Sequence, residues 1–228
     1  MRKAILYIIG FAALLASASC DKRAEYDQTL GLLSRYNVLP SGNGSTQVAV
    51  FSNTDWTVEM DHPVDWASID RLGGHKSGYL VFDYEVNYGR ARRVVLVFKA
   101  GGETRYLDMY QKPAIADADC ILELTSEEKP TLSVSADGTT EELPFKTNLI
   151  YNLDEMYLTL QYAEGQEPEA PWITLDAVER DKVTITVLPN TTGAVRKAYV
   201  QISHTDAGSY DSTEGDTINS NMLTVIQN

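Results

Sequence analysis

The sequence predicts an all-β protein that consists of two tandem antiparallel β-sandwiches, and three observations support this prediction. From Tyr36 onward, short runs of alternating polarity are broken by Gly, Asn, Asp or Pro about every eight to twelve residues, which is typical of a sandwich. A set of landmark residues also occurs twice in the same order. The length of 228 residues leaves about a hundred residues for each copy, a common size for a domain with one core.

Each copy of the repeat contains a strand that begins with Trp, a turn that leads from Asn to Arg, and a last strand that ends with Gln. The first copy reads W-A-S-I-D from Trp66, N-Y-G-R-A-R from Asn87 and L-D-M-Y-Q up to Gln111. The second copy reads W-I-T-L-D from Trp172, N-T-T-G-A-V-R from Asn190 and L-T-V-I-Q up to Gln227. The duplication predicts one fold used twice.

Structural roles account for the shared polar residues. An Asn side chain can cap its own turn, and we expect Gly89 and Gly193 to supply positive φ in these turns. We expect Arg92 and Arg196 to bind loop carbonyls, and the two final Gln side chains to bind backbone groups. A ligand role is the less favoured alternative, because residues that both copies share are those that the fold itself requires.

The three Trp residues are expected to lie in the cores. Trp66 and Trp172 are equivalent across the repeat, and Trp56 has Tyr151 at the matching offset in the second copy. This prediction removes the best surfaces on which a sugar ring stacks.

Alternation predicts seven strands in each copy. In the first copy the expected strands cover residues 35–39, 45–52, 55–60, 66–70, 78–86, 91–99 and 103–111. In the second copy they cover residues 131–135, 140–147, 154–162, 172–176, 182–188, 195–204 and 220–227. The clearest core faces carry Leu80, Phe82, Tyr84 and Val86, then Val94, Leu96 and Phe98, and in the second copy Val183, Ile185 and Val187. We therefore expect sandwiches over residues 34–112 and 121–228, joined by a linker over residues 113–120.

The first 19 residues predict a secretory signal peptide. Arg2 and Lys3 precede an apolar run over residues 4–15, which is shorter than the about 20 residues of a membrane span, and small residues follow. Small residues directly before Cys20 resemble the lipobox of bacterial lipoproteins, which implies cleavage before Cys20 and acylation of its thiol and amine. Ordinary cleavage after the A-S-A of residues 16–18 is the alternative. Residues 20–33 are then a lipidated tether, with a short helix as an alternative.

Charge and reactive residues narrow the function. Loss of Arg2 and Lys3 leaves 17 bases against 32 acids, a net charge of -15, so nucleic acid is not an expected partner. Beyond Cys20 the only thiol is Cys120, so no internal disulfide forms, and we expect Cys120 to be a small buried apolar residue. The sequence lacks G-x-S-x-G, H-E-x-x-H and C-x-x-C motifs. We expect no enzyme activity, no catalytic residue, no cofactor and no metal.

The landmarks, together with S-N-T-D-W from Ser52 and the glycines Gly73 and Gly74, resemble the BACON domain of Bacteroidetes surface proteins. The resemblance is good over residues 35–112 and partial in the second copy, where T-N-L-I-Y from Thr147 replaces S-N-T-D-W. It implies an immunoglobulin-like sandwich, lipid anchoring at the outer membrane and cell surface, and association with glycan-handling systems. Some family members are proposed to bind carbohydrate or mucin, and others resemble spacers.

Insertions distinguish the second copy, one before Trp172 and one in the hairpin loop from Thr205 to Asn219, and such insertions often carry function. The candidate ligand-binding residues are Tyr210, Asp206 and Asp211 in this loop and Tyr88 in the first turn.

Three other interpretations of the loop stay open. Its acids suit Ca²⁺, but the D-x-D-x-D-G spacing is absent. The triplets D-S-T and D-T-I resemble the O-glycosylation signal of Bacteroidetes, with Ser212 and Thr217 as acceptors. A solvated hairpin tip is favoured over both.

The favoured hypothesis is a lipid-anchored surface protein that binds glycan or glycoprotein without catalysis, with the membrane, carbohydrate and other surface proteins as partners. The alternative is a spacer or accessory subunit of a surface assembly. Exposed aromatics in a concave patch favour binding, whereas a rigid contact between the domains favours a spacer.

Overall fold

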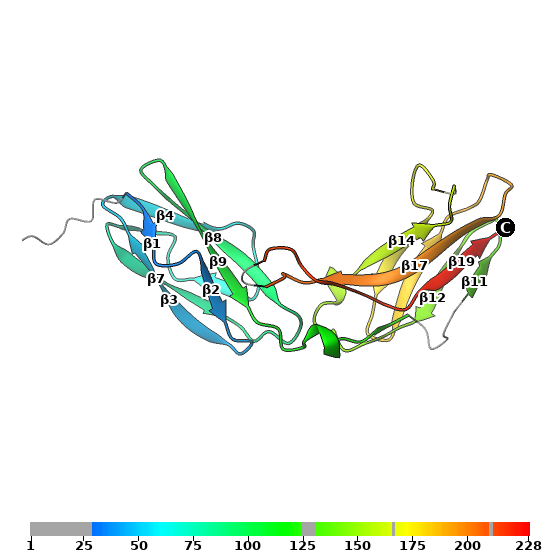
Figure 1. Cartoon of the computed structure of the whole chain (residues 1–228), viewed down its shortest axis with the longest axis horizontal. Coiled ribbons are helices and arrows are strands. Elements are labelled where there is room, and N and C mark those ends of the chain that lie inside the picture. The colour runs from blue at the N-terminus through cyan, green and yellow to red at the C-terminus, as the bar shows by residue number, and fades with distance from the viewer. Residues whose placement is uncertain (1–28, 125–130, 166, 210–211) are drawn as a thin grey trace, which may run out of the picture.

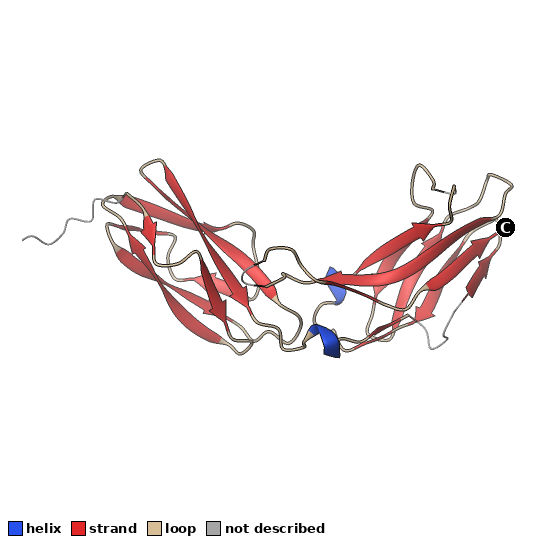
Figure 2. Ribbon diagram, in the orientation of Figure 1, coloured by secondary structure: helices blue, strands red, loops and turns tan. Residues whose placement is uncertain are grey.

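A computed structural model gives the structure of the protein and describes residues 29–124, 131–165, 167–209 and 212–228. The predicted signal peptide, Cys20 and most of the predicted tether lie outside the described residues. The strands form two sandwiches that follow one another along the long axis of the molecule (Figure 1). Helix is limited, among the described residues, to two single turns near the place where the sandwiches meet, η1 (Asp117–Asp119) and η2 (Leu153–Glu155) (Figure 2). The all-β fold class is confirmed.

The first sandwich has one sheet in the order β1-β3-β7-β5 and another in the order β2-β9-β8-β4-β6. The strands of the first sheet are β1 (Gly31–Leu32), β3 (Gly44–Phe51), β7 (Gly78–Tyr84) and β5 (Ala67–Ile69). Those of the second are β2 (Tyr36–Leu39), β9 (Glu103–Gln111), β8 (Arg92–Ala100), β4 (Asp55–Met60) and β6 (Gly73–His75). Neighbouring strands are antiparallel except β2 and β9, which are parallel.

The second sandwich repeats this plan. One sheet has the order β11-β19-β17-β14, with β18 also paired to β17, and another has the order β12-β16-β15. Its strands are β11 (Thr131–Val134), β19 (Leu223–Gln227), β17 (Arg196–Thr205), β14 (Tyr157–Tyr162), β18 (Thr217–Asn219), β12 (Thr139–Pro144), β16 (Lys182–Val187) and β15 (Ile173–Val178). A separate pair joins β10 (Leu122–Glu123) to β13 (Lys146–Thr147). Here β11 and β19 are the parallel pair, as β2 and β9 are in the first sandwich.

Each sandwich has its own core, because alternate residues of facing strands point inward. Leu80, Phe82, Val94, Leu96 and Phe98 are fully buried in the first core, and Val183, Ile185 and Val187 are buried in the second. Burial of one such side chain contributes about 1.5–3 kcal/mol. The three Trp residues are also buried, as expected. The cores, rather than disulfides, therefore stabilise the described part of the chain.

The same three-residue contact closes both sandwiches. Arg92 lies over the Trp66 ring, 4.4 Å from its centroid, and its Nε donates to Oε1 of Gln111 at 2.8 Å. In the second sandwich Arg196 lies 4.3 Å from the Trp172 centroid, and its Nε donates to Oε1 of Gln227 at 2.8 Å. Each Arg also donates to a loop carbonyl, and each Gln donates to backbone oxygens. The predicted structural roles of Arg and Gln are confirmed.

The largest differences from the expected strands lie at short or interrupted elements. β1 extends the first sandwich to residues expected in the tether, and Leu30 beside it is fully buried in the core. The strand expected over residues 140–147 is split into β12 and β13, and the one expected over residues 154–162 begins with η2. A strand of two or three residues has too few positions for alternation to mark it.

Candidate functional site between the sandwiches

The first turn of the repeat packs directly against the second sandwich. Asn87 caps this turn, since its Oδ1 accepts from the N–H of Gly89 at 3.0 Å. The prediction of positive φ at Gly89 is wrong, because only Gly193 of the two turn glycines has it, at +72°. Gly89 is needed for another reason: a Cβ there would collide with the side-chain oxygen of Asn152. The same oxygen accepts from the N–H of Arg90 at 3.4 Å. The turn therefore serves as a contact surface.

Arg90 forms the centre of the junction, by which we mean the contacts between residues 88–93 and residues 117, 151–155, 204–209 and 212. Its side chain is completely buried. Nε and Nη2 donate to Oδ1 of Asp117 at 3.1 and 2.8 Å, and Nη2 lies 3.4 Å from Oδ2 of Asp206. Nη1 donates to the carbonyl of His204 at 3.0 Å. A buried guanidinium is tolerated only with such compensation, so the junction depends on these acceptors.

The hydrogen-bond network fixes the tautomer of His204. A guanidinium group can only donate hydrogen bonds, so Nη1 of Arg90, which lies 3.0 Å from Nδ1 of His204, must donate to that nitrogen. The ring proton therefore lies on Nε2, which donates to Oε2 of Glu155 at 3.0 Å. Oε2 also accepts from Nδ2 of Asn152 at 2.8 Å. The hydrogen bond from His204 is the main reason why the pKa of Glu155 lies below its usual value, so Glu155 is ionised at neutral pH.

The inserted hairpin loop of the second sandwich docks on the first. The N–H of Ala207 donates to the carbonyl of Ala91 at 3.2 Å. Nη2 of Arg93 donates to the carbonyls of Ser209 and Ser212. The loop is thus held by backbone as well as side-chain groups, and Figure 1 shows it reaching from β17 to the first sandwich.

Asp206, a predicted ligand residue, lies inside this junction. Its side chain is almost fully buried, and Oδ2 faces Arg90. Its Oδ1 accepts from the N–H groups of Gly208 and Asp216, both at 2.8 Å. Both carboxylate oxygens are therefore used within the protein, and Asp206 organises the loop.

The other predicted residues are placed as follows. Tyr88 stacks on Tyr151 across the junction with centroids 4.9 Å apart, and the two rings are 54% and 60% exposed. Ser212 is exposed, and Oγ1 of Thr217 lies 2.7 Å from Oγ1 of Thr205. Tyr210, Asp211 and Cys20 lie outside the described residues. Cys120 is half-buried against the second core, and burial raises the pKa of its thiol.

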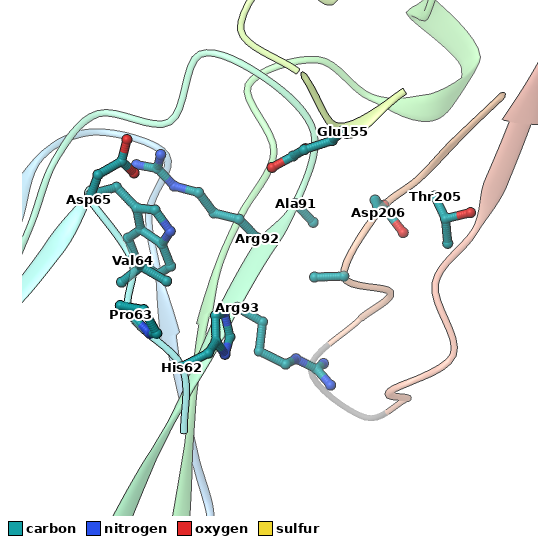
Figure 3. A pocket seen from close by; sticks show the side chains of 12 residues that line it. His62, Pro63, Val64, Asp65, Ala91, Arg92, Arg93, Glu155, Thr205 and Asp206 are labelled. Atoms are coloured by element: carbon teal, nitrogen blue, oxygen red, sulfur yellow. The ribbon is translucent and has the colours of Figure 1, made fainter. Parts of the chain in front are cut away.

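A groove of about 770 Å³ lies between the sandwiches and is the candidate functional site. We call it the interdomain groove. Figure 3 shows that its walls come from the β4–β5 loop, the start of β8, η2 and the docked hairpin loop. The lining residues are His62, Pro63, Val64, Asp65, Trp66, Ala91, Arg92, Arg93, Glu155, Thr205, Asp206 and Ala207.

The chemistry of the interdomain groove is mixed. Asp65 and Glu155 are exposed and supply carboxylate acceptors, and Figure 3 shows Glu155 directed into the opening. Pro63 and Val64 supply apolar surface on one wall. Burial lowers the pKa of the Arg92 guanidinium, which lies over the Trp66 ring. Trp66 is only 8% exposed, so the groove offers hydrogen-bonding groups but no open Trp, Tyr or Phe ring.

Sequence reasoning did not identify Arg90, His204 or Glu155 as partners. One difference in the sequence could have drawn attention to Arg90. The turn of the first sandwich contains this additional Arg, whereas the matching turn of the second has no Arg before Arg196. No cluster of three or more His, Cys, Asp or Glu residues suited to a metal ion occurs among the residues that the structure describes. No helix in the same residues is long and apolar enough to span a membrane.

A family model named BACON, described as "Putative binding domain, N-terminal", matches residues 162–228. This segment therefore carries a BACON domain. The match falls on the second copy, although the residues that led us to the resemblance are more complete in the first. No curated protein matches the chain.

Several solved structures are similar to the chain. A GH5 xyloglucanase of Bacteroides ovatus, in complex with a heptasaccharide, is 13% identical, with 47% of this chain and 27% of that chain covered and a TM-score of 0.34. A protein from Bacteroides thetaiotaomicron, solved by NMR, is 11% identical, with 42% of this chain and 98% of that chain covered and a TM-score of 0.30. Tandem immunoglobulin domains of titin are 7% identical, with 87% of this chain and 97% of that chain covered and a TM-score of 0.30. The chain thus spans about a quarter of the xyloglucanase.

Proposed function

We propose that the chain is a non-enzymatic binding protein that recognises a glycan or glycoprotein through the interdomain groove. The observation that carries this proposal is the buried Arg90, which holds the two walls of the groove in one arrangement. A preorganised site loses little conformational entropy when its ligand binds. The match of residues 162–228 to a putative binding domain supports the same conclusion.

The groove suits a ligand rich in hydroxyl groups. Its volume of about 770 Å³ is in the range of small-ligand sites. Asp65 and Glu155 can accept hydrogen bonds from sugar hydroxyls, and Pro63 and Val64 can contact apolar C–H groups. We propose no catalytic role for His204, because both of its ring nitrogens are already engaged, one by Arg90 and one by Glu155.

We also propose a second BACON-like domain in residues 34–112, a lipid anchor at Cys20 and an outer-membrane location at the cell surface. The matching contacts of Arg92 and Arg196 with Trp and Gln support the duplication. The residues before Cys20 support the anchor. Radiolabelled palmitate should enter the wild-type chain in its bacterial host and not a Cys20→Ser variant. Protease added to intact cells should degrade the wild-type chain; a chain that survives until lysis would place it inside.

A rigid spacer in a surface assembly is the second candidate function. The end-to-end arrangement with a buried ion network favours it, and so does the lack of an exposed Trp, Tyr or Phe ring in the lining of the interdomain groove. In this case the groove would have no small ligand.

A glycan and glycoprotein array probed with the purified chain separates the two functions. We expect a specific signal that falls about tenfold or more with Asp65→Asn, because a hydrogen bond to a charged group contributes about 1.5–3 kcal/mol. Asp137→Asn is the matched control, since Asp137 is exposed and lies outside the groove lining. A chain that folds normally but gives no signal on any glycan or glycoprotein would favour the spacer.

A further inference from the structure

A second groove of about 850 Å³ lies on the outer face of the first sandwich. We call it the N-terminal groove. It is formed by the β1–β2 connection and by outward-facing residues of β8 and β9, whose inward neighbours Leu107 and Met109 are in the core. The lining residues are Gly31, Leu32, Leu33, Ser34, Arg35, Val95, Thr104, Arg105, Tyr106 and Asp108.

The N-terminal groove has an exposed tyrosine ring, which the lining of the interdomain groove lacks. Tyr106 is 62% exposed and Leu33 is 79% exposed, and both line the groove. A sugar ring can place its apolar C–H face on an exposed tyrosine, while its hydroxyls reach nearby polar groups. Ser34 and Thr104 supply hydroxyls in the same lining.

The charge of the N-terminal groove is opposite to that of the chain as a whole. Two guanidinium groups line it, those of Arg35 and Arg105. Among the described residues no carboxylate lies within ion-pair distance of Arg35, while Arg105 pairs with Glu103. The one acid in the lining, Asp108, is paired with Arg93 at 3.1 Å. A formal net charge of -13 would repel an acidic ligand elsewhere, so this groove is a local exception.

We propose that the N-terminal groove binds a uronic acid residue of an acidic polysaccharide. The sugar ring lies on Tyr106, and its carboxylate is held by Arg35 with support from Arg105. A planar guanidinium matches a carboxylate with two parallel hydrogen bonds, which a neutral sugar cannot accept in the same way. This proposal does not depend on the interdomain groove.

The test compares two polymers that differ in charge and little else, polygalacturonate and its methyl ester. The purified full chain is titrated with each by isothermal calorimetry. We expect polygalacturonate to bind and the methyl ester to bind at least about tenfold more weakly. Raising the salt from about 50 mM to about 500 mM should weaken the binding of polygalacturonate, because exposed charges are screened.

Variants assign the binding to the groove. Arg35→Gln and Tyr106→Ala should each weaken polygalacturonate binding by about tenfold. Arg180→Gln and Tyr79→Ala are the matched controls, because both residues are exposed and lie outside this groove, and they should change binding less than twofold. All of these changes are at exposed positions, and circular dichroism confirms that each variant is folded.

Three outcomes would overturn the proposal. Equal binding of polygalacturonate and its methyl ester would mean that the carboxylate does not contribute to recognition. An equal loss of polygalacturonate binding in Arg35→Gln and Arg180→Gln would mean that the binding site lies elsewhere. Binding to phosphatidylglycerol vesicles without binding to polygalacturonate would assign the groove to a membrane surface. Asp65→Asn, which tests the interdomain groove, should leave polygalacturonate binding unchanged, so the two proposals can fail separately.

Discussion

The two sandwiches use the same turn and the same hairpin in opposite ways. In the first sandwich the turn from Asn87 to Arg92 meets the second sandwich, whereas the hairpin at Gly101 is a tight turn. In the second sandwich the hairpin loop after Thr205 is long and docks on the first, whereas the turn from Asn190 leaves Val195 exposed. The two sandwiches are therefore arranged head to tail, and residues that differ between them lie where they touch.

Residues that the two sandwiches do not share build the junction. Gly89 lets Asn152 approach, Arg90 gathers acceptors from the linker and the second sandwich, and the inserted loop adds backbone contacts. The shared Arg–Trp–Gln contacts stabilise each sandwich separately. Variants at shared and unshared positions should therefore have different effects.

The largest effect is expected for Arg90→Leu. The change leaves Asp206 buried without its cation and removes the donor to His204, and loss of one partner of a buried ion pair costs about 3–5 kcal/mol. Chemical denaturation should show this loss, and small-angle X-ray scattering should show a wider range of interdomain distances. Arg71→Leu is the control. The Arg71 guanidinium and the carboxylate of its partner Asp70 are both partly exposed, so this change should cost less than about 0.5 kcal/mol. Equal stability of the two variants would mean that Arg90 does not stabilise the junction.

The sequence predicted the fold well because alternation of polarity is a local property. β4 and β9 have the expected bounds, and the inward faces of β7, β8 and β16 are the expected ones. The junction could not be predicted in this way. Arg is an exposed residue by default, so nothing in a local pattern shows that Arg90 is buried. The inserted loop was interpreted as a ligand loop because the head-to-tail arrangement, which gives it a surface to dock on, is not visible in the sequence.

A smaller effect is expected when the two turn glycines are replaced by alanine. In Gly89→Ala the new Cβ collides with Asn152, which should cost about 1–3 kcal/mol. In Gly193→Ala the cost arises from the positive φ and should be about 1–2 kcal/mol, since space around Gly193 is open. The two losses can be measured by thermal denaturation.

A second substitution separates the two causes. Asn152→Ala removes the atom that Gly89→Ala strikes, so the double variant should lose less stability than the sum of the single variants. The loss of stability caused by Asn152→Ala should simply add to the loss caused by Gly193→Ala, because Gly193 has no contact with Asn152. Additive behaviour in both pairs would contradict a junction role for Gly89.

The smallest effect is expected from the titration of Glu155. Its pKa in the folded protein lies below the usual value, chiefly because His204 donates to it, so folding favours the ionised form. Such a group contributes stability above its unfolded pKa, about 4.5, and this contribution is lost as the pH falls through the folded pKa. In Glu155→Gln the contribution is absent at every pH. The free energy of unfolding of the wild type should therefore exceed that of Glu155→Gln at pH 7 by about 0.2–1 kcal/mol, because the exposed Glu155 carboxylate is screened by solvent. This difference should shrink below about pH 4.5. Glu164→Gln is the control at an exposed position outside the junction, and it should cost less than about 0.5 kcal/mol. If the difference for Glu155→Gln is independent of pH, the His204–Glu155 hydrogen bond does not couple the junction to protonation.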